Sequence, residues 1–504
     1  MKRKLSLLLA VVLCLGMVLT ASASGRTDKE SITIALQGEL TTLDAQYGAE
    51  DGNMRPITQN IYDTLYVLNK ETLEPMFWLV TGLNMVDNLT WEFKLREGVV
   101  FHDGTPLTTD DVVFSVNRIL SDELNSPIIS SINAIDHAEV VDATTFRIIT
   151  KEPDPVLPKR LTLIPIISKP FTEARTAIDL TLVANGTGPY KFVEWRTGAY
   201  VKITANENYW GEKPVIKNAT YRFIEEKLTA LSALKAGEVD LAVNMLPEYV
   251  QDIPKVFSNT SFETYWVRFD QRPDSTSVFK NKDLRLAAAY AIDYNAIAGA
   301  LFSGYATPCQ GQMGQPGFVG FNPAVQPYPY DVEKARELMK AAGYKNEEIV
   351  FVSQRGRWLK DGEVTEAIAA YLTDAGFNVQ TKFLSWSEWL KVLFDKTKTP
   401  DIILSSNSND FFDMDRPYSA CVLSESSQSA VSNPEYDAAI LAARQELDPV
   451  KRQAMYDDLA VKFFDDPFAI YVLSMNDLHG GATDLVWTPR RDTRLYLIEM
   501  SFAD

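Results

Sequence analysis

The sequence predicts an α/β protein that is built around mixed β-sheets and divided into two or three lobes. Two observations support this prediction. The chain has 504 residues, which is more than one ordinary hydrophobic core serves. Along it, short runs rich in β-branched and aromatic residues alternate with segments of helical periodicity. Apolar residues make up 46% of the chain, so a folded globular protein is expected.

The expected strands share period-two alternation or short apolar runs, and the expected helices share good starting residues. Strands are expected at residues 31–36, 91–95, 145–150, 200–205, 219–224, 348–353, 377–384, 401–406 and 468–474. Helices are expected at 228–236, 361–376, 385–394 (capped by Ser385 or Ser387) and within 432–465, where Asn433-Pro434 and Asp448-Pro449 begin helices. Residues 308–330 are rich in proline and glycine and predict a loop.

Residues 1–23 have the features of a secretory signal peptide. Three positive residues at 2–4 precede an apolar run at 5–19, and Ala21-Ser22-Ala23 is a small-residue cleavage site. A membrane anchor is the alternative, but a run of about 15 apolar residues is short for a bilayer span. We therefore expect cleavage after Ala23 and an exported protein.

The net charge excludes several partners. It is −18 for the whole chain, and removal of the three positive residues of the signal leaves −21. Such a surface repels nucleic acid and anionic membranes. Cys14 in the signal follows Leu13, a residue too large for usual lipoprotein processing, which favours a soluble product over a lipid-anchored one.

Two cysteines, Cys309 and Cys421, remain in the mature chain. In an oxidising compartment they are candidates for a disulfide, and the alternative is two buried thiols.

The stretch WEFKLREGVVFHDGTPLTTDDVVFSVNRIL, residues 91–120, contains acids and a histidine that resemble a catalytic group. Its pattern instead predicts a strand, a turn and a helix. Thr108 and Asp111 fit a capping box, and Asp110 and Asp111 lie at the positive end of the helix dipole. His102 has no Ser, Cys or metal-ligand partner at a useful spacing, so we expect it to be structural.

The same stretch, from FKLREGVVFHDGTPLTTDD onward, resembles the signature of the family-5 extracellular solute-binding proteins, the peptide, nickel and opine receptors of ABC importers. Further segments resemble that family in the same order. They are GTGPYKFVEW (186–195), LTALSALKAGEVDLA (228–242), NKDLRLAAAYAIDYNAI (281–297) and YDVEKARELMKAAGY (330–344). Together the segments extend from about residue 31 to the C-terminus and are highly specific.

The resemblance implies a two-lobed periplasmic-binding-protein fold, type II and cluster C-like, with mixed sheets and a hinge. Two crossings are expected near residues 265–272 and 474–482. The implied organisation is 1–23 signal peptide, 24–268 first part of lobe I, 269–478 lobe II and 479–504 the C-terminal return to lobe I. A ligand would bind in the cleft between the lobes, and the protein would be a monomer.

The resemblance also places candidate ligand residues in the loop after the first strand and in the second lobe. Tyr47, Gly48 and Met54 belong to the early loop, where Ala45 replaces the family's usual proline. Arg355 and Arg357 follow a strand, and a guanidinium grips a carboxylate through two parallel hydrogen bonds. A salt bridge to a surface acid is the alternative for either arginine.

The loop after the strand at 401–406 is rich in Asp and Asn, and the resemblance implies that one aspartate pairs with a ligand's α-amino group. Asp410 is the first choice, with Asp413 and Asp415 behind it, and Asn407 adds a polar contact. The spacing of these acids does not match an EF-hand calcium loop, so no metal is expected. Trp266, Arg268, Trp386 and Tyr418 complete the candidates as aromatic walls and an anion contact, although each aromatic residue is also a good core residue.

The resemblance implies a periplasmic receptor that captures a short peptide or similar zwitterion and delivers it to an inner-membrane ABC permease. Glutathione, an opine, a nickel chelate or a sugar are the alternatives with the same fold. With three histidines in the chain, a histidine metal cluster is not expected, and we expect no cofactor. A secreted hydrolase is disfavoured because the chain lacks G-x-S-x-G, H-E-x-x-H and a Cys/His arrangement.

Overall fold

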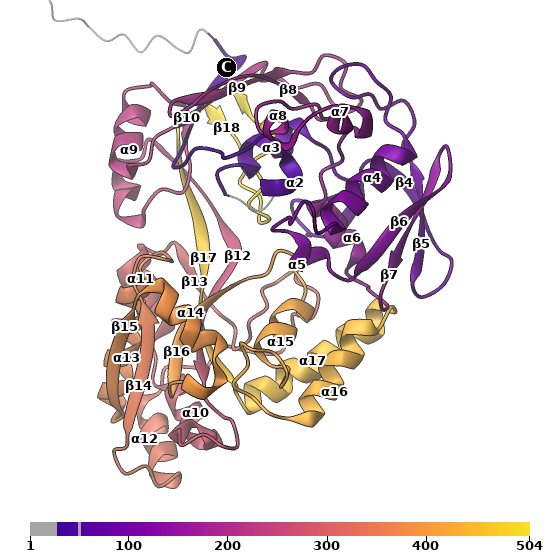
Figure 1. The fold of residues 1–504 in the computed structure, drawn as a ribbon. Coiled ribbons are helices and arrows are strands. Elements are labelled where there is room, and N and C mark those ends of the chain that lie inside the picture. Colours follow the sequence, from indigo (N-terminus) through magenta and orange to yellow (C-terminus); the bar gives the residue numbers. More distant parts are fainter. Residues whose placement is uncertain (1–27, 49–51, 504) are drawn as a thin grey trace, which may run out of the picture.

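The computed structural model describes residues 28–48 and 52–503, and the expected signal peptide lies outside this part of the chain. Two lobes share one eleven-stranded sheet (Figure 1). Its strands, in spatial order, are β15 (Asn378–Leu384), β14 (Glu348–Gln354), β16 (Ile402–Ser408), β12 (Lys255–Phe269), β17 (Ala469–Gly481), β11 (Leu241–Ala242), β1 (Ser31–Leu36), β10 (Asn218–Phe223), β9 (Tyr200–Ala205) and β8 (Tyr190–Arg196), with β13 (Ala306–Pro308) beside β17. This confirms the α/β class and the two-lobed fold.

The first lobe adds a second sheet and several short helices. Its four-stranded antiparallel sheet has the order β4 (Val80–Met85), β5 (Thr90–Leu95), β7 (Thr145–Thr150) and β6 (Ile135–Asp142), and small pairs are formed by β2 (Tyr66–Leu68) with β3 (Pro75–Phe77) and by β18 (Leu485–Val486) with β19 (Ser501–Phe502). Its helices are α2 (Ala45–Gly48), α3 (Arg55–Ile61), α4 (Thr109–Leu120), α5 (Ile129–Ile132), α6 (Leu157–Arg160), α7 (Lys169–Glu173), α8 (Ala177–Leu180) and α9 (Lys227–Lys235).

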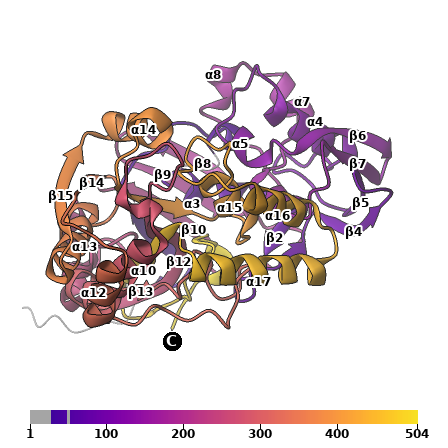
Figure 2. The same cartoon turned by 90° about the horizontal axis from the view of Figure 1, so that it is seen from below.

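The second lobe carries the longer helices, and they form two groups. Figures 1 and 2 show α10, α12 and α13 on one side and α15, α16 and α17 on the other. The helices are α10 (Lys282–Tyr290), α11 (Tyr294–Phe302), α12 (Val332–Ala341), α13 (Asp361–Ala375), α14 (Trp386–Phe394), α15 (Asp415–Cys421), α16 (Pro434–Gln445) and α17 (Pro449–Asp465). Asn433 and Asp448 cap α16 and α17, and Ser385 rather than Ser387 caps α14.

Strands β12 and β17 connect the lobes because each runs through both halves of the large sheet. In the first lobe, residues 255–260 of β12 pair with 476–481 of β17, and in the second lobe 264–268 pair with 469–474. The register shifts between Thr260 and Thr264, where the extra residues of β12 form a bulge. The divisions predicted at 268/269 and 478/479 fall inside these two strands.

Outside the two strands, the lobes also touch at one side of the molecule. Gln445 at the end of α16 donates a hydrogen bond to Glu152, which follows β7 (3.0 Å), and Lys159 of α6 donates to the Phe412 carbonyl (3.1 Å). The face that joins the lobes is therefore larger than the strand pair.

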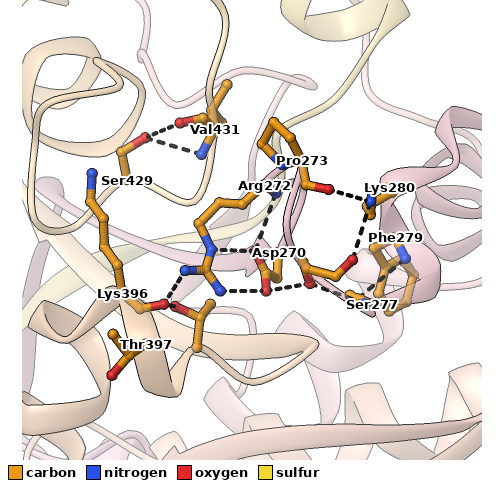
Figure 3. A network of polar contacts seen from close by, with 12 residues as sticks. Asp270, Arg272, Pro273, Ser277, Phe279, Lys280, Lys396, Thr397, Ser429 and Val431 are labelled. Atoms are coloured by element: carbon orange, nitrogen blue, oxygen red, sulfur yellow. Dashed lines mark hydrogen bonds and ion pairs between the residues drawn. The ribbon is translucent and has the colours of Figure 1, made fainter.

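The end of β12 is fixed in the second lobe by a polar network (Figure 3). Asp270 accepts hydrogen bonds from Arg272 Nε (2.9 Å) and from the Ser275 hydroxyl (2.7 Å), while Arg272 also donates to the Lys396 carbonyl. Lys280 Nζ donates to the Pro273 carbonyl at 2.6 Å. These contacts satisfy the turn that follows the strand and anchor one end of the connection.

His102 has a structural position, as the sequence predicted. Its ring lies 3.0 Å from the Gly188 carbonyl oxygen, and its backbone N–H donates to Gly186 (2.9 Å). Burial lowers the pKa of His102 to about 4, so the ring is neutral at physiological pH. The capping box of Thr108 and Asp111 at the start of α4 is also confirmed.

The glycines of the GTGPY segment permit a close backbone approach. A Cβ at Gly186 would lie 2.0 Å from the Ile61 carbonyl oxygen, and one at Gly188 would lie 2.7 Å from the same atom. The Gly188 N–H donates to that oxygen at 2.9 Å. Only glycine fits at these two positions, so this motif joins α3 to β8 rather than contacting a ligand.

We predict that Gly186→Ala lowers the thermal unfolding midpoint, with a free-energy cost of about 3 kcal/mol, because the methyl group overlaps the backbone at Ile61. The control is Gly299→Ala in α11, where no atom lies within 4 Å of the added methyl group. Alanine there should stabilise the helix by up to about 1 kcal/mol. Equal midpoints for both variants and the parent protein would contradict this account.

Candidate functional site

The cavity that we call the main cavity lies between the lobes, where β12 and β17 pass from one lobe to the other. It has a volume of about 370 Å³. Its lining comes from α3, from the segments after β11 and before η5 (Leu497–Glu499), from the middle of β12 and β17, and from the loop between β14 and α13. The main residues are Arg55, Gln59, Lys227, Asn244, Met245, Phe262, Glu263, Tyr265, Trp358, Leu359, Asn476, Asp477, His479 and Leu495. A cavity of this size suits a small molecule.

The bulge in β12 forms part of the cavity wall and is held by specific hydrogen bonds. Gln315 donates to the Ser261 carbonyl (2.8 Å), and the Asn409 N–H donates to the Phe262 carbonyl (3.3 Å). The Glu263 N–H donates to the Ser261 hydroxyl oxygen at 3.3 Å. Backbone groups of the bulge that do not pair with β17 thus have other hydrogen-bond partners. The bulge places Phe262 and Glu263 in the cavity wall.

Two acids, Glu263 and Asp477, line the cavity without an ion pair to any described residue. Glu263 accepts a hydrogen bond from the Ser406 hydroxyl (2.8 Å). Burial raises the pKa of Glu263. Burial, and then the charge of Glu263, raise the pKa of Asp477 to about 7. The cavity therefore contains two carboxyl groups that form no ion pair with a described residue, and burial makes both harder to ionise.

The basic and imidazole groups in the wall have other contacts. Lys227 Nζ donates to the Asn244 carbonyl at 2.5 Å, and burial lowers its pKa. His479 Nδ1 accepts a hydrogen bond from the Asn244 N–H (3.3 Å), and burial lowers the pKa of its ring to about 4. His479 is consequently neutral and adds no charge to the cavity.

Trp358 and Tyr265 form an aromatic wall of the cavity on the side of the second lobe. The loop that carries Trp358 is positioned by a buried acid, Asp361. The Asp361 carboxylate accepts the backbone N–H groups of Gly356 (3.0 Å), Arg357 (3.0 Å) and Trp358 (2.8 Å). The loop that carries Arg357 and Trp358 is therefore closed around one side chain. Tyr265 completes the wall and donates its hydroxyl to the Leu359 carbonyl at 2.7 Å.

Arg357 and Asp410, the two residues predicted to grip a zwitterion, both lie within electrostatic range of Glu263. The charge of Arg357 lowers the pKa of Glu263, and the charge of Asp410 raises it. The Arg357 guanidinium lies over the Trp386 ring, 5.2 Å from its centre. Asp410 is paired with Arg416, and its carboxylate lies in a small recess that shares Arg55 and Phe262 with the main cavity. Neither residue lines the main cavity itself.

Three other candidates lie on exposed surfaces. Arg355 forms an ion pair with Glu366 and covers the Phe383 ring at 3.8 Å, which matches the alternative of a surface salt bridge. Trp386 is 39% exposed and stacks on Trp389 with 5.0 Å between ring centres. Tyr47 is 49% exposed on α2, which ends at Gly48.

Five candidates are buried in the interior instead of facing the cavity. Met54, Trp266, Arg268, Asp413 and Tyr418 are each at most 2% exposed. Met54 packs in the core of the first lobe, and Trp266 and Tyr418 pack together with α15 and α17. Arg268 donates to the Gln428 carbonyl (2.5 Å), and its burial lowers the pKa of the guanidinium to about 10. Asp413 forms a two-pronged pair with Arg452 (2.6 and 2.8 Å).

Asn407 and the cysteines lie on the inner side of the second lobe. Asn407 Nδ2 contacts Cys421 Sγ at 3.9 Å. The disulfide considered from the sequence is not formed, because Cys309 and Cys421 are both free and buried, and Cys309 Sγ instead lies 3.7 Å from the Ser474 hydroxyl. Burial raises the pKa of each thiol to about 12, so both thiols are protonated.

Sequence reasoning missed Glu263, Asp477 and Trp358. Trp358 directly follows Arg357, so the prediction chose the correct segment but not the residue in it that lines the cavity. Glu263 and Asp477 are acids within runs that otherwise read as buried strands, at or beside the predicted crossings. Acidic side chains are rarely buried without a partner. An acid within an expected buried strand was therefore the signal that could have identified these two residues.

The fold and the cavity define a protein class: two lobes joined by a strand pair, with a cavity between them, form the arrangement of hinge-closing binding proteins. The sequence profile of bacterial extracellular solute-binding proteins, family 5 Middle, matches residues 74–429. The chain belongs to this family, as its motifs predicted.

Individual relatives are distant. The glutathione-binding protein GsiB of Pectobacterium atrosepticum is 29% identical over 323 residues, which is 62% of this chain and 61% of that protein. The substrate-binding protein CtaP of Listeria monocytogenes has a TM-score of 0.82 at 24% identity, covering 95% and 100% of the two chains. DppA of Helicobacter pylori, solved with the peptide STSA, has a TM-score of 0.71 at 22% identity, covering 94% and 98%.

Metal and membrane features were also sought in the described part of the chain. Residues 28–48 and 52–503 hold no group of three or more His, Cys, Asp or Glu side chains placed to bind a metal ion. Within the same residues, each helix is too short or too polar to cross a bilayer.

We predict that Asp413→Ala lowers protein stability by about 3–5 kcal/mol, because it leaves the buried Arg452 guanidinium unpaired. Thermal unfolding without ligand is the measurement. Glu435→Ala, which removes an exposed pair with Lys462 (3.2 Å), is the control and should change stability by less than about 1 kcal/mol. An unchanged midpoint together with lost ligand binding would make Asp413 a ligand contact instead.

We predict that Asp477→Asn raises the unfolding midpoint at pH 8 and has little effect at pH 4. The folded-state pKa of Asp477, about 7, lies above its value in an unfolded chain, so this group costs stability progressively as pH rises from about 4 to 7. The asparagine variant removes that loss. Parallel midpoint-against-pH curves for variant and parent would contradict the assignment.

Proposed function

We propose that this protein is the substrate-binding receptor of an ABC importer and captures a short peptide or similar zwitterion between its lobes. The observation that carries the proposal is the cavity at the strand crossing, with unpaired acids on its floor and an aromatic wall. Membership of the solute-binding family supports the same reading. The work of the protein is binding and closure, without covalent chemistry.

Recognition of the two ends of the ligand rests on opposite charges at the rim of the cavity. Arg357 would hold the ligand carboxylate, because its guanidinium lies over Trp386, has no ion pair with a described residue and offers several N–H donors. Asp410 would hold the α-amino group. Its pairing with Arg416 leaves room for a second donor, since a carboxylate accepts about four hydrogen bonds.

Closure would use the two crossing strands as the hinge. Residues 261–263 of β12 lie in the register shift, where ladder pairing between β12 and β17 is interrupted. A change in backbone angles there moves one lobe against the other and leaves the sheets of both lobes intact. A ligand that touches both walls favours the closed state by its additional contacts.

Glutathione is the second candidate ligand. It is favoured by the similarity to GsiB, whose name states that it binds glutathione. Glutathione carries an α-amino group and carboxylates, so Arg357 and Asp410 would serve it as well. An opine or a nickel chelate would fit the same fold, and a sugar would fit it but bring no positive group to the acids of the cavity.

Location and partner follow from the same proposal. The signal-like residues 1–23 would direct export and be cleaved, and the mature receptor would work in the periplasm. It would deliver its ligand to an inner-membrane ABC permease. The negative charge of the mature chain agrees with a soluble receptor that does not bind nucleic acid.

The test is native mass spectrometry of the purified mature protein, followed by calorimetric titration with peptides and glutathione. A co-purified peptide or peptide conjugate is the expected result. Arg357→Ala and Asp410→Ala should each weaken binding about 10- to 100-fold without a lower unfolding midpoint, because each removes one charged hydrogen-bond partner. Lys462→Ala, an exposed cation at a distance, is the control. Full affinity in both the Arg357→Ala and the Asp410→Ala variants would overturn the assignment of these two residues as ligand contacts.

A further inference from the structure

The floor of the cavity has more hydrogen-bond acceptors than the protein can satisfy. Asp477 has no ion pair to a described residue, and Glu263 has a single hydroxyl donor, Ser406. Two uncharged acceptors add to them. The side-chain oxygens Oε1 of Gln59 and Oδ1 of Asn476 are buried without a hydrogen-bond partner among the described residues, and both residues line the cavity.

Three of these acceptors come from the two connecting strands and one from a helix of the first lobe. Glu263 belongs to β12, Asn476 and Asp477 belong to the neighbouring β17, and Gln59 lies on α3 of the first lobe. Thr260 of β12 is paired with Asn476, so the acids stand on adjacent strands at the crossing. Burying oxygen acceptors without donors is costly. A ligand that brings donors recovers this cost.

Arg55 of α3 lines the same cavity, and the other basic groups near the floor have contacts of their own. Lys227 donates to a backbone carbonyl, and Arg357 lies over Trp386. His479 accepts a hydrogen bond at Nδ1 and is neutral. Two carboxylates and two amide oxygens are all acceptors, so an organic cation with several N–H donors complements them.

We infer that the floor formed by Glu263, Asp477, Asn476 and Gln59 is a subsite for a guanidinium or ammonium side chain, so that the preferred ligand is a basic peptide. This inference rests on the proposed peptide-receptor function. Arg357 and Asp410 would hold the termini, and the floor would hold a third, positively charged group. A guanidinium presents five N–H donors, which matches two carboxylates and two amide oxygens.

The test compares two tripeptides, Ala-Arg-Ala and Ala-citrulline-Ala, by calorimetric titration of the mature protein. Citrulline has nearly the shape of arginine but no charge, and the termini are identical. The arginine peptide should bind at least about tenfold more tightly, as expected for one charged hydrogen-bonded group. Glu263→Gln and Asp477→Asn should each reduce that ratio towards one. Glu435→Gln, an exposed acid outside the cavity, should leave it unchanged.

The outcomes separate the two proposals. Equal binding of both peptides to the parent protein overturns the basic subsite and leaves the peptide receptor standing. Binding of neither peptide overturns the peptide receptor and the subsite with it. A tenfold ratio that persists in both floor variants also overturns the subsite, because the discrimination would then arise elsewhere. Unfolding midpoints that are no lower than that of the parent protein show that any loss of the ratio in the variants is local.

Discussion

The structure depends on the continuity of two strands. β12 and β17 pair with each other in both lobes, so a single backbone ladder fixes the position of everything attached to it. Its interruption at residues 261–263 is the place where the ladder can bend without losing either sheet, and it is also where Glu263 enters the cavity. In the proposed function, the hinge and the floor of the binding site are therefore made by the same few residues. A ligand bound there would act directly on the geometry that sets the angle between the lobes.

Buried carboxylates in this protein have two different fates. Asp361, Asp270 and Asp413 are each surrounded by donors and hold loops or helices in place. Glu263 and Asp477 have fewer hydrogen-bond donors around them. Their burial therefore costs folding free energy, which the rest of the fold offsets. The first three acids stabilise the scaffold, and the last two are available to a ligand. The difference lies in the number of hydrogen-bond donors around each carboxylate and not in its charge alone.

Sequence patterns located the elements well because alternation and capping act locally. The strand at 31–36, the capping box at Thr108 and the helix starts at Asn433 and Asp448 are all as expected. The site was harder to predict because side-chain direction depends on long-range pairing. Trp266 and Arg268 alternate correctly on a strand, yet α14, α15 and the segment around Gln428 cover that face. Glu263 faces the cavity through a register shift, which no local pattern encodes.

Most of the segments that identify the family lie away from the cavity, and only the segment 228–242 adjoins it, next to Lys227 and Val243. His102 and the glycines at 186 and 188 lock together the backbone of the first lobe, where a single added methyl group would not fit. Evolution can therefore exchange the residues of the cavity floor without disturbing the motifs by which relatives are recognised. Two members of this family with identical signatures are free to carry chemically unrelated cargo, and divergence of cargo would leave little trace in the parts of the sequence that change most slowly.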